Sequence, residues 1–213
     1  MSTNNLCNQG FKGVKGVMLV VSGPSGVGKG TVCAELVKNN SDIFLSISAT
    51  SRSPRKGEID GVHYYFKTQQ EFDDMIANDE LLEYAHYVTS TYGTPFAPCI
   101  EHLEKGENIV LEIEVQGGMK VKQKYPETIM IFVVPPTLDD LEARLRGRGT
   151  ETDELVQKRL KRAYEEFTLI EHYDYIVVND TVEGAAEQIK SIIVAENCRK
   201  NHCILNIKKE LGL

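Results

Sequence analysis

Residues 17–31 decide the fold, and they read Val-Met-Leu-Val-Val-Ser-Gly-Pro-Ser-Gly-Val-Gly-Lys-Gly-Thr. A short apolar run leads into a glycine-rich turn, and a helical pattern with Val32, Leu36 and Val37 on one face follows. This order is the context that a phosphate-binding loop requires, although a plain glycine-rich turn is the alternative. Glycines let backbone N–H groups converge on one anion, and the positive end of the next helix faces the same point. The predicted phosphate-binding residues are Gly23, Pro24, Ser25, Gly26, Val27, Gly28, Lys29, Gly30 and Thr31.

The end of this loop both fits and departs from the usual pattern. Lys29 supplies a full positive charge that can reach the β- and γ-phosphates of a nucleotide. The hydroxyl residue that usually follows the lysine and binds Mg²⁺ is replaced by Gly30, and Thr31 comes one place later. The Mg²⁺ contact therefore cannot be assigned to position 30. We expect phosphate oxygens and water to hold most of the coordination shell, because Mg²⁺ commonly keeps several waters.

Length and composition limit the classes of protein that the chain can belong to. Its 213 residues, 41% of them hydrophobic, suit one domain with inserts or two small domains. The net charge of −7 argues against a nucleic-acid binder that relies on bulk charge. No apolar run approaches the length of a membrane span, and residues 1–16 lack the apolar centre of a signal peptide. Five scattered cysteines without a C-x-x-C pair indicate a reduced, cytoplasmic chain, and no metal-ligating residue is assigned.

Apolar segments alternate with helical patterns along most of the chain. The segments that predict strands are Phe44–Ser48, Leu81–His86, Ile109–Ile113, Ile129–Val134 and Tyr175–Val178. Such alternation predicts an α/β fold, with a mostly parallel sheet covered by helices on both sides. Ligands of such sheets gather at the carboxyl ends of the strands, where the P-loop also lies. Residues 48–97 differ, because they are basic, turn-rich and then aromatic, and residues 64–66 alternate as in a small antiparallel sheet. We interpret this block as an insert.

Two local excesses of basic residues stand out in this acidic chain. The insert carries Arg52, Arg55 and Lys56, with Tyr64 just beyond them. Arginine forks and a tyrosine hydroxyl suit a phosphate monoester, whereas a solvated basic turn is the alternative. The second excess follows a predicted helix and includes glycines that can act as hinges, which favours a mobile flap that closes over transferring phosphates. An exposed helix with i,i+4 ion pairs is the alternative there. Its arginines are Arg144, Arg146, Arg148 and Arg159.

Glu83 interrupts an apolar stretch and suggests a reader of a nucleobase. A carboxylate there can accept two hydrogen bonds from a guanine edge, whose N1–H and 2-amino group form a donor pair that adenine lacks. Thr94, after Tyr92 and Gly93, can donate a hydrogen bond to O6 of the same base. The alternative is that Glu83 is an outward-facing strand residue.

Several longer runs together resemble the guanylate kinase family over about residues 16–197. They are SGPSGVGKGT (22–31), SATSRSPRKGEIDGVHYYF (48–66), LLEYAHY (81–87), TYGTP (91–95), EIEVQG (112–117), RLRGRGTET (144–152) and VVND (177–180). The resemblance implies a P-loop core, a small mixed GMP-binding insert and a helical lid. The expected parts are a mobile N-terminal tail (1–15), a core (16–47, 98–138 and 160–197), the insert (48–97), the lid (139–159) and a C-terminal tail (198–213).

The resemblance also implies a reaction, ATP and GMP giving ADP and GDP with Mg²⁺, and it implies roles for individual residues. GMP or dGMP is expected to contact Ser48, Arg52, Arg55, Tyr64, Glu83, Tyr92, Thr94 and Glu114. ATP is expected on the P-loop, with Asn179 near the adenine. The residues expected to act in catalysis are Lys29, Arg52, Arg144, Arg148 and Arg159. No nucleic acid, membrane or particular oligomeric state is expected.

Two further positions depart from the family pattern. The chain has Glu112-Ile-Glu114 where the family often has two aspartates, so the extra methylene groups shift both carboxylates. Thr94 stands where a serine is common, and it keeps the hydroxyl. Two other functions stay open at this point: a non-catalytic module that binds a phosphorylated peptide in the GMP cleft, and a kinase for another nucleoside monophosphate. Titration with ATP and GMP separates the first, and the base-reading residues decide the second.

Overall fold

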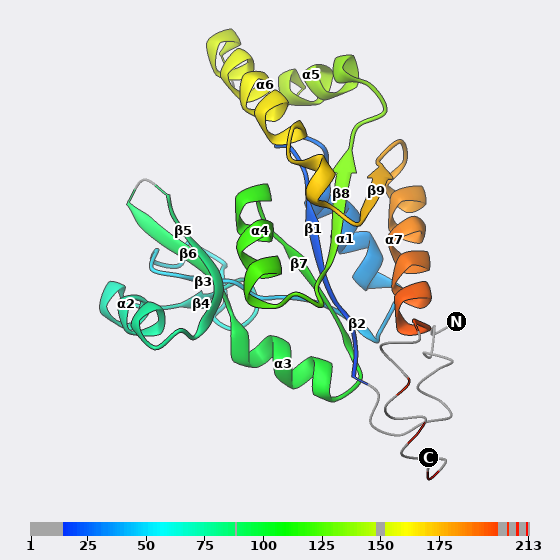
Figure 1. Ribbon diagram of the computed structural model, residues 1–213. Coiled ribbons are helices and arrows are strands. Elements are labelled where there is room, and N and C mark those ends of the chain that lie inside the picture. Colours follow the sequence, from blue (N-terminus) through cyan, green and yellow to red (C-terminus); the bar gives the residue numbers. More distant parts are fainter. Residues whose placement is uncertain are drawn as a thin grey trace.

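The computed structural model describes residues 15–87, 89–147 and 152–199, together with residues 204, 208 and 212. Its centre is a parallel five-stranded sheet with the strand order β2-β7-β1-β8-β9 (Figure 1). The strands are β1 (Met18–Ser22), β2 (Ile43–Leu45), β7 (Asn108–Glu112), β8 (Ile129–Val134) and β9 (Tyr175–Val178). The α/β class with a parallel sheet flanked by helices is therefore confirmed.

Strand β1 shows why the P-loop lies at the middle of this sheet. All five of its residues are buried, and it pairs with β7 on one side and β8 on the other. Its side chains alternate, because Leu19 and Val21 pack into one hydrophobic cluster and Met18 and Val20 into another. Both faces of the sheet are thus covered, as the even apolarity of the strand predicts. The loop that follows β1 opens at the carboxyl edge between two other strand ends.

Helices from different parts of the chain cover the two faces. Helices α1 (Lys29–Lys38) and α7 (Val182–Asn197) pack on one face through the cluster that contains Leu19, and α3 (Phe96–Glu104) and α4 (Val115–Lys124) cover the other. Figure 1 shows this division on either side of the sheet. Helix α4 begins directly after β7, so residues 112–117 lie at the carboxyl edge beside the P-loop.

The insert forms a second sheet with the order β4-β3-β6-β5. Its elements are β3 (Ala49–Thr50), β4 (Tyr65–Phe66), α2 (Gln69–Ala77), β5 (Leu81–Tyr87) and β6 (Ser90–Pro95). Phe72 of α2 is fully buried against Ala49 and Leu81, which gives this part a small core of its own. Pairing in this sheet is mixed, because β3 runs antiparallel to β6 but parallel to β4, whereas the alternation of residues 64–66 indicated an antiparallel sheet. Two-residue strands carry too short an alternation to fix their direction.

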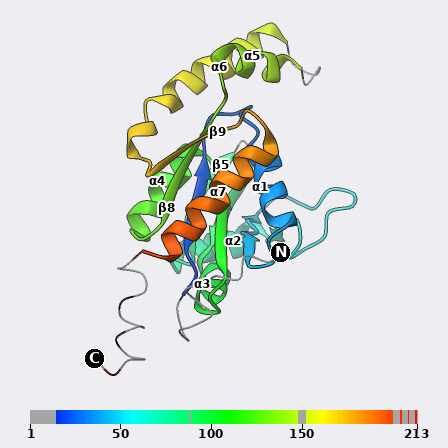
Figure 2. The same ribbon diagram turned by 90° about the vertical axis from the view of Figure 1, so that its right-hand side faces the viewer.

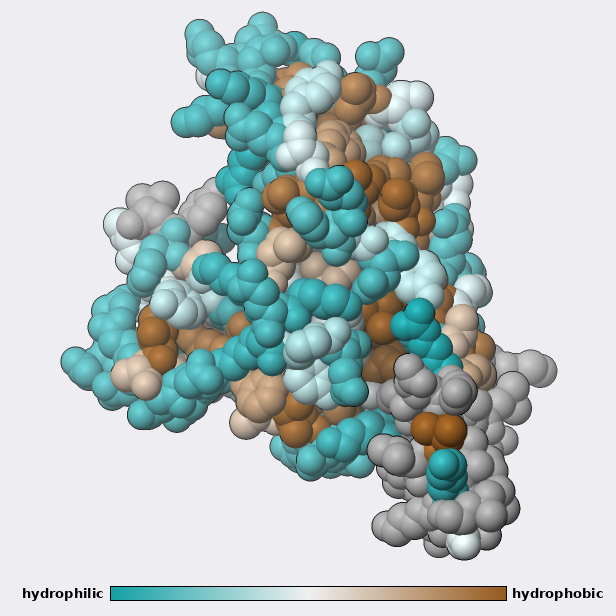
Figure 3. All heavy atoms as spheres, viewed as in Figure 1, coloured by the Kyte–Doolittle hydropathy of each residue, from teal (hydrophilic) through white to brown (hydrophobic). Residues whose placement is uncertain are grey.

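Helices α5 (Leu138–Arg146) and α6 (Asp153–Phe167) form an arm beyond the carboxyl edge of the central sheet, as Figures 1 and 2 both show. Leu141, Leu145, Val156 and Ala163 bury the inner side of the pair in the core cluster. The outer surface of α6 is mainly hydrophilic in Figure 3. This amphipathic arrangement suits an arm that rests on the P-loop while it keeps charged side chains in water. A short 3₁₀ turn, η1 (Ile170–His172), leads from α6 to β9.

Most predicted strands lie where the apolar runs are. β8 and β9 have the bounds that the sequence predicts, whereas the run expected at 44–48 forms a strand only over Ile43–Leu45. Within the described residues, no helix is long and apolar enough to cross a membrane.

Candidate active site

The glycines of the P-loop are required by close contacts as well as by backbone angles. At Gly23 (φ 146°) an added Cβ would lie 2.3 Å from the carbonyl oxygen of Val133, so any other residue would clash with the backbone there. Gly28 (φ 91°) is the N-cap of α1, and a Cβ there would lie 2.6 Å from the Asn179 amide nitrogen. The N-cap Gly28 has no side chain, and no cap hydrogen bond is made at the start of α1 among the described residues, so the first N–H groups of this helix can bind an anion.

Lys29 folds back over this loop. Its Nζ atom donates hydrogen bonds to the carbonyl oxygens of Gly23 (2.5 Å) and Pro24 (3.2 Å). Burial lowers the pKa of the Lys29 ammonium, and nearby carboxylates, Glu112 first among them, act in the opposite direction. The side chain therefore places a positive charge among the converging N–H groups, where donor phosphates would bind.

Glu112, at the end of β7, lies beside the position where the hydroxyl residue is absent. A Cβ added to Gly30 would lie 3.2 Å and 3.4 Å from the two carboxylate oxygens of Glu112. Burial raises the pKa of Glu112, and Lys29 opposes that shift. Glycine at position 30 thus leaves room for the longer carboxylate.

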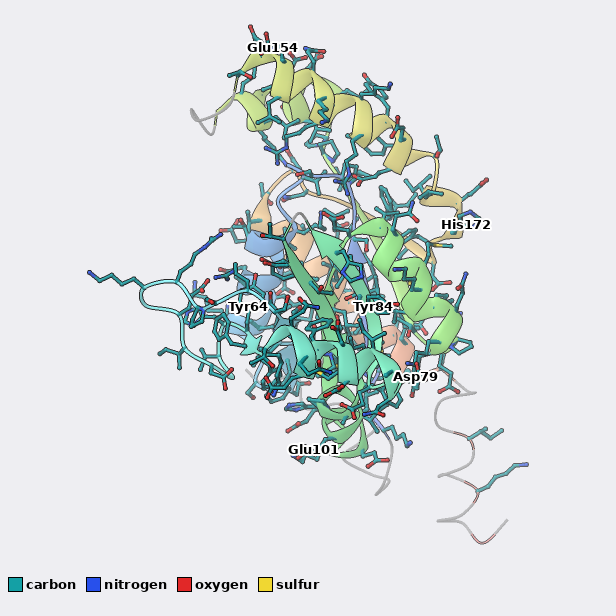
Figure 4. The ribbon with its side chains drawn as sticks, turned by 90° about the vertical axis from the view of Figure 1, so that its left-hand side faces the viewer. Tyr64, Asp79, Tyr84, Glu101, Glu154 and His172 are labelled. Carbon is teal, nitrogen blue, oxygen red and sulfur yellow. The ribbon has the colours of Figure 1, made fainter. Side chains whose placement is uncertain are left out.

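A cavity of about 590 Å³ lies between the central sheet and the insert. It is lined by Lys29, Glu112, Glu114 and Gly117 from the core side. From the insert it is lined by Ser48, Arg52, Arg55, Tyr64, Glu83 and Tyr92. Of the expected acceptor-binding residues, only Thr94 does not line it directly. Figure 4 shows Tyr64 and a further lining residue, Tyr84, below the helix that carries Glu154.

A carboxylate that the sequence analysis missed occupies the basic end of this cavity. Glu58 accepts two hydrogen bonds of 2.9 Å from Arg52 Nη1 and Nη2, and a third of 2.6 Å from the backbone N–H of Arg55. The Arg52 hydrogen bonds lower the pKa of Glu58 to about 2. Arg52 also donates to the Tyr92 hydroxyl (3.2 Å) and lies 5.4 Å from the Tyr64 ring centroid. Both Nη groups of Arg52 are therefore paired with Glu58 in this structure. In the sequence, the only sign of this pairing is that Glu58 follows Arg55 by three residues.

Glu83 faces the cavity from β5, opposite Thr94 on β6. The two residues are register partners, and the buried Thr94 hydroxyl donates to Glu83 Oε1 at 2.9 Å. Burial raises the pKa of the Glu83 carboxyl, and the Thr94 hydrogen bond partly offsets that shift. The position does not fit the alternative of an outward-facing strand residue. Because the Thr94 proton points to Glu83, its expected bond to O6 stays a prediction.

The α5–α6 arm brings two of the expected arginines to the P-loop. Arg144 Nη2 donates to the Asn179 carbonyl oxygen (2.9 Å), and its Nη1 lies 3.4 Å from the Val27 carbonyl oxygen. The side-chain amide of Asn179 also donates to the Val27 carbonyl oxygen (2.7 Å). Asn179 therefore stabilises the P-loop, in addition to its expected position near adenine. Arg159 Nη2 donates to Ser25 Oγ at 2.6 Å.

The remaining arginines of the arm differ in position. Arg146 pairs with Glu142 and Asp153 on the arm itself, and Arg148 lies outside the described residues. Arg162, which the sequence analysis missed, points to the P-loop side. A second cavity, of about 110 Å³, is lined by Gly23, Ser25, Lys29, Glu114, Arg159, Arg162 and Glu166.

A P-loop that adjoins a second, arginine-bearing phosphate pocket defines the class of nucleotide phosphotransferases. A family model for guanylate kinase matches residues 15–196. A guanylate kinase of Halalkalibacterium halodurans is 50% identical over 190 residues, which are 89% of this chain and 93% of that protein. One of Clostridioides difficile is 49% identical over 201 residues, 92% of this chain and 98% of that protein. The crystal structure of guanylate kinase from Anaplasma phagocytophilum superposes with a TM-score of 0.68, at 31% identity and 89% coverage of both chains.

The chain belongs to the guanylate kinase family. It is accordingly an ATP-dependent nucleoside monophosphate kinase whose small-molecule substrates are ATP and GMP. The expected resemblance is confirmed. The individual roles of the site residues remain predictions.

Proposed function

We propose that the chain transfers the γ-phosphoryl group of ATP to GMP in the space between the two cavities. Lys29 and Glu114 line both cavities, and this shared boundary is the observation that carries the proposal. An acceptor phosphate in the larger cavity and a donor phosphate over the P-loop would meet there. Positioning and charge stabilisation supply most of the catalysis of such transfers, so the site needs no nucleophilic side chain.

The larger cavity suits GMP at both ends. Arg52 and Arg55 form its basic end, where guanidinium groups can bind the acceptor phosphate after Glu58 moves away. Glu83 lies in the same cavity and can accept hydrogen bonds from N1–H and the 2-amino group of guanine. The insert thus offers an anion site and a guanine site in one pocket. Ser48, Tyr64, Tyr92 and Glu114 complete its proposed GMP-contacting wall.

The donor side supplies positive charge around the γ-phosphoryl group. The P-loop N–H groups and Lys29 would bind the β- and γ-phosphates. Arg159, which donates a hydrogen bond to Ser25 Oγ in this structure, lies close enough to stabilise the charge of the γ-phosphoryl group during transfer. A GMP phosphate oxygen attacks the γ-phosphorus in line. As its bond to phosphorus forms, the bond to the bridging oxygen breaks, and ADP leaves with the electron pair.

Mg²⁺ is the expected companion of ATP, and the chain offers it one acidic side chain. Glu112 is the last residue of β7, the neighbour of β1, and its carboxylate lies beside Gly30 at the start of α1. Oxygen ligands and retained waters are what Mg²⁺ prefers, and Glu112 would hold it directly or through water. When bound, the ion neutralises charge on the β- and γ-phosphates. Among the described residues, no group of three or more His, Cys, Asp or Glu side chains is arranged so that it could hold a metal ion by itself.

For the parts of the enzyme we keep the division that the sequence predicts, as a proposal. The second sheet lies within residues 48–97, and the arm overlaps the proposed lid at 139–159, although α6 continues to Phe167. We place the reaction in the cytoplasm, and the buried thiols of Cys33 and Cys99, which form no disulfide, are in line with this.

An acceptor screen tests the proposal. ADP formation from Mg·ATP is measured with GMP, dGMP, IMP, AMP, CMP and UMP, with Lys29→Met as a donor-site control. We expect activity with GMP and dGMP, weak activity with IMP and almost none with the others. A buried charge left without its partners can disfavour a wrong ligand by about 10⁴-fold. Equal rates with AMP and GMP would contradict the guanine assignment. ATP that fails to bind at all would favour the phosphopeptide module instead.

A further inference from the structure

An ion pair joins the lid arm to the loop that ends the acceptor cavity. Arg162 Nη2 on α6 donates to Glu114 Oε2 at 2.7 Å, and Arg162 Nε donates to Glu166 Oε1 at 3.0 Å. Arg162 and Glu114 are 46% and 59% exposed, whereas Glu166 is only 13% exposed. Glu166 therefore anchors the guanidinium on the arm, and Glu114 is the partner with freedom to leave.

Arg162 belongs to the donor side of the site. It follows Arg159 by three residues, which places both on one side of α6, and both line the small cavity over the P-loop together with Lys29. Arg159 touches the P-loop serine. A negatively charged γ-phosphoryl group in this cavity would therefore find two arginines of the arm.

Glu114 lies at both the acceptor side and the donor side of the site. It is the N-cap residue of α4, its side chain makes no cap hydrogen bond, and it lines the acceptor cavity as well as the small one. Its charge contributes to the raised pKa of Glu83, so the two carboxylates are electrostatic neighbours. An acceptor base with hydrogen-bond donors in that cavity would attract Glu114 away from the arm.

We propose that the Glu114–Arg162 ion pair is a latch that couples acceptor binding to phosphoryl transfer, and that Arg162 is a further lid arginine for the transferred group. The inference rests on the proposed function. Without acceptor, two carboxylates neutralise Arg162 and leave it little charge for the γ-phosphoryl group. When GMP binds, Glu114 turns to the base and Arg162 is released. An exposed ion pair is weak, so the exchange is easy.

The latch favours one of two reactions. In transfer, a GMP phosphate oxygen bonds to the γ-phosphorus and ADP leaves. In hydrolysis, water attacks instead and gives ADP, inorganic phosphate and a proton. Both reactions gain from an arginine on the γ-phosphoryl group. Holding Arg162 away until acceptor is present therefore suppresses hydrolysis more than transfer.

Three variants of the full chain test this. Arg162→Met removes the guanidinium. Glu114→Asp keeps a carboxylate but shortens it by one methylene group, so it loses reach to Arg162. The double variant combines both. Lys161→Met is the matched control, since it removes a positive charge from the adjacent exposed position of the same helix. ADP formation is measured with Mg·ATP in the presence and absence of GMP.

We expect Arg162→Met to lower kcat for transfer by about 1000-fold, the lower end of the range for arginine fingers, with little change in the KM for GMP. Glu114→Asp should raise the ratio of GMP-independent hydrolysis to transfer by about tenfold, and the double variant should remove this rise. Lys161→Met should behave as the parent does. Arg162→Lys, which keeps charge without the fork, should give an intermediate kcat and serves if Arg162→Met does not fold.

The inference is overturned if Arg162→Met, or Arg162→Lys in its place, keeps the parent kcat. It is also overturned if Glu114→Asp leaves the hydrolysis ratio unchanged. A merely structural ion pair would change the melting temperature without changing that ratio. If the parent itself shows no GMP-dependent ADP formation, the proposed function fails, and this result is distinct from failure of the latch.

Discussion

The change Glu83→Gln removes one charge from the acceptor cavity and leaves its volume almost unchanged. Thr94 donates to Glu83 Oε1, so the amide oxygen of Gln would take over that bond and turn its NH₂ group to the base. Donors would then face the N1–H and 2-amino donors of guanine. If the amide flips instead, one neutral acceptor replaces the ionised carboxylate.

Either orientation loses at least one hydrogen bond to a charged group, which contributes about 1.5–3 kcal/mol. Since about 1.4 kcal/mol corresponds to a factor of ten, the KM for GMP should rise by about 10- to 150-fold. The preference for GMP over IMP should shrink, because IMP lacks the 2-amino group. The KM for ATP should stay within about twofold, because ATP binds at the other cavity.

Steady-state kinetics with GMP and IMP measure both effects. Glu80→Gln is the matched control, because this exposed residue directly precedes β5 and does not line the acceptor cavity. Unchanged melting temperatures would show that the fold is intact. A Glu83→Gln enzyme with the parent KM for GMP and the parent GMP/IMP ratio would refute the assignment of Glu83 as the base reader.

The same residue predicts a pH dependence. Burial raises the pKa of Glu83, and GMP binding needs the ionised form, so protons compete with GMP as the pH falls through that raised value. The KM for GMP should therefore begin to rise at a higher pH than an ordinary carboxyl would cause. The GMP phosphate titrates in the same way with the parent and with Glu83→Gln. The difference between their KM values for GMP, followed with pH, therefore reports Glu83 alone. Parallel pH profiles for the parent and Glu83→Gln would contradict this.

Three further predictions concern the parts that surround the reacting groups. Glu58→Gln should lower the KM for GMP, because the phosphate no longer competes with a carboxylate for Arg52. The decrease should be no more than about fivefold, since an ion pair that still reaches solvent contributes at most about 1 kcal/mol; a raised KM would show that Glu58 assists binding. Asn179→Ala removes the buried 2.7 Å hydrogen bond to Val27 and should lower stability by about 1–3 kcal/mol, with weaker ATP binding, as measured by thermal unfolding with and without ATP. Gly30→Ser should crowd Glu112 and raise the Mg²⁺ concentration for half-maximal activity by about threefold, and adding Glu112→Asp should reverse this effect. If the parent and the Gly30→Ser variant depend on Mg²⁺ concentration in the same way, the role given to Glu112 is contradicted.

The sequence predicts the parts of the fold that depend on short, uninterrupted signals. The strand before the P-loop and the strand at 129–134 are local apolar patterns whose residues are buried on both faces of the sheet, and both lie where expected. The paired direction of β3 and β4 was not predictable, because two residues of each strand leave no alternation to interpret. Short strands obtain their direction from the chain around them rather than from their own residues.

Contacts between distant charged residues were the least predictable part of the site. Arg162 and Glu114 lie 48 positions apart, and neither is marked by a local motif as the partner of the other. Arg144 was expected to serve the transferred phosphate, yet its guanidinium lies on the backbone of Val27 and Asn179. Such pairs depend on how two elements pack, and charge runs alone do not show which side of a helix will face the site.

The most direct test of the central claim follows the phosphorus itself. The parent enzyme is incubated with Mg²⁺, GMP and ATP labelled in the γ-phosphoryl group, and the products are separated. If ATP lies on the P-loop and GMP in the adjoining cavity, the label appears in the β-position of GDP, in an amount equal to the ADP formed. Label found only in inorganic phosphate, or ATP left unconsumed, would contradict the account.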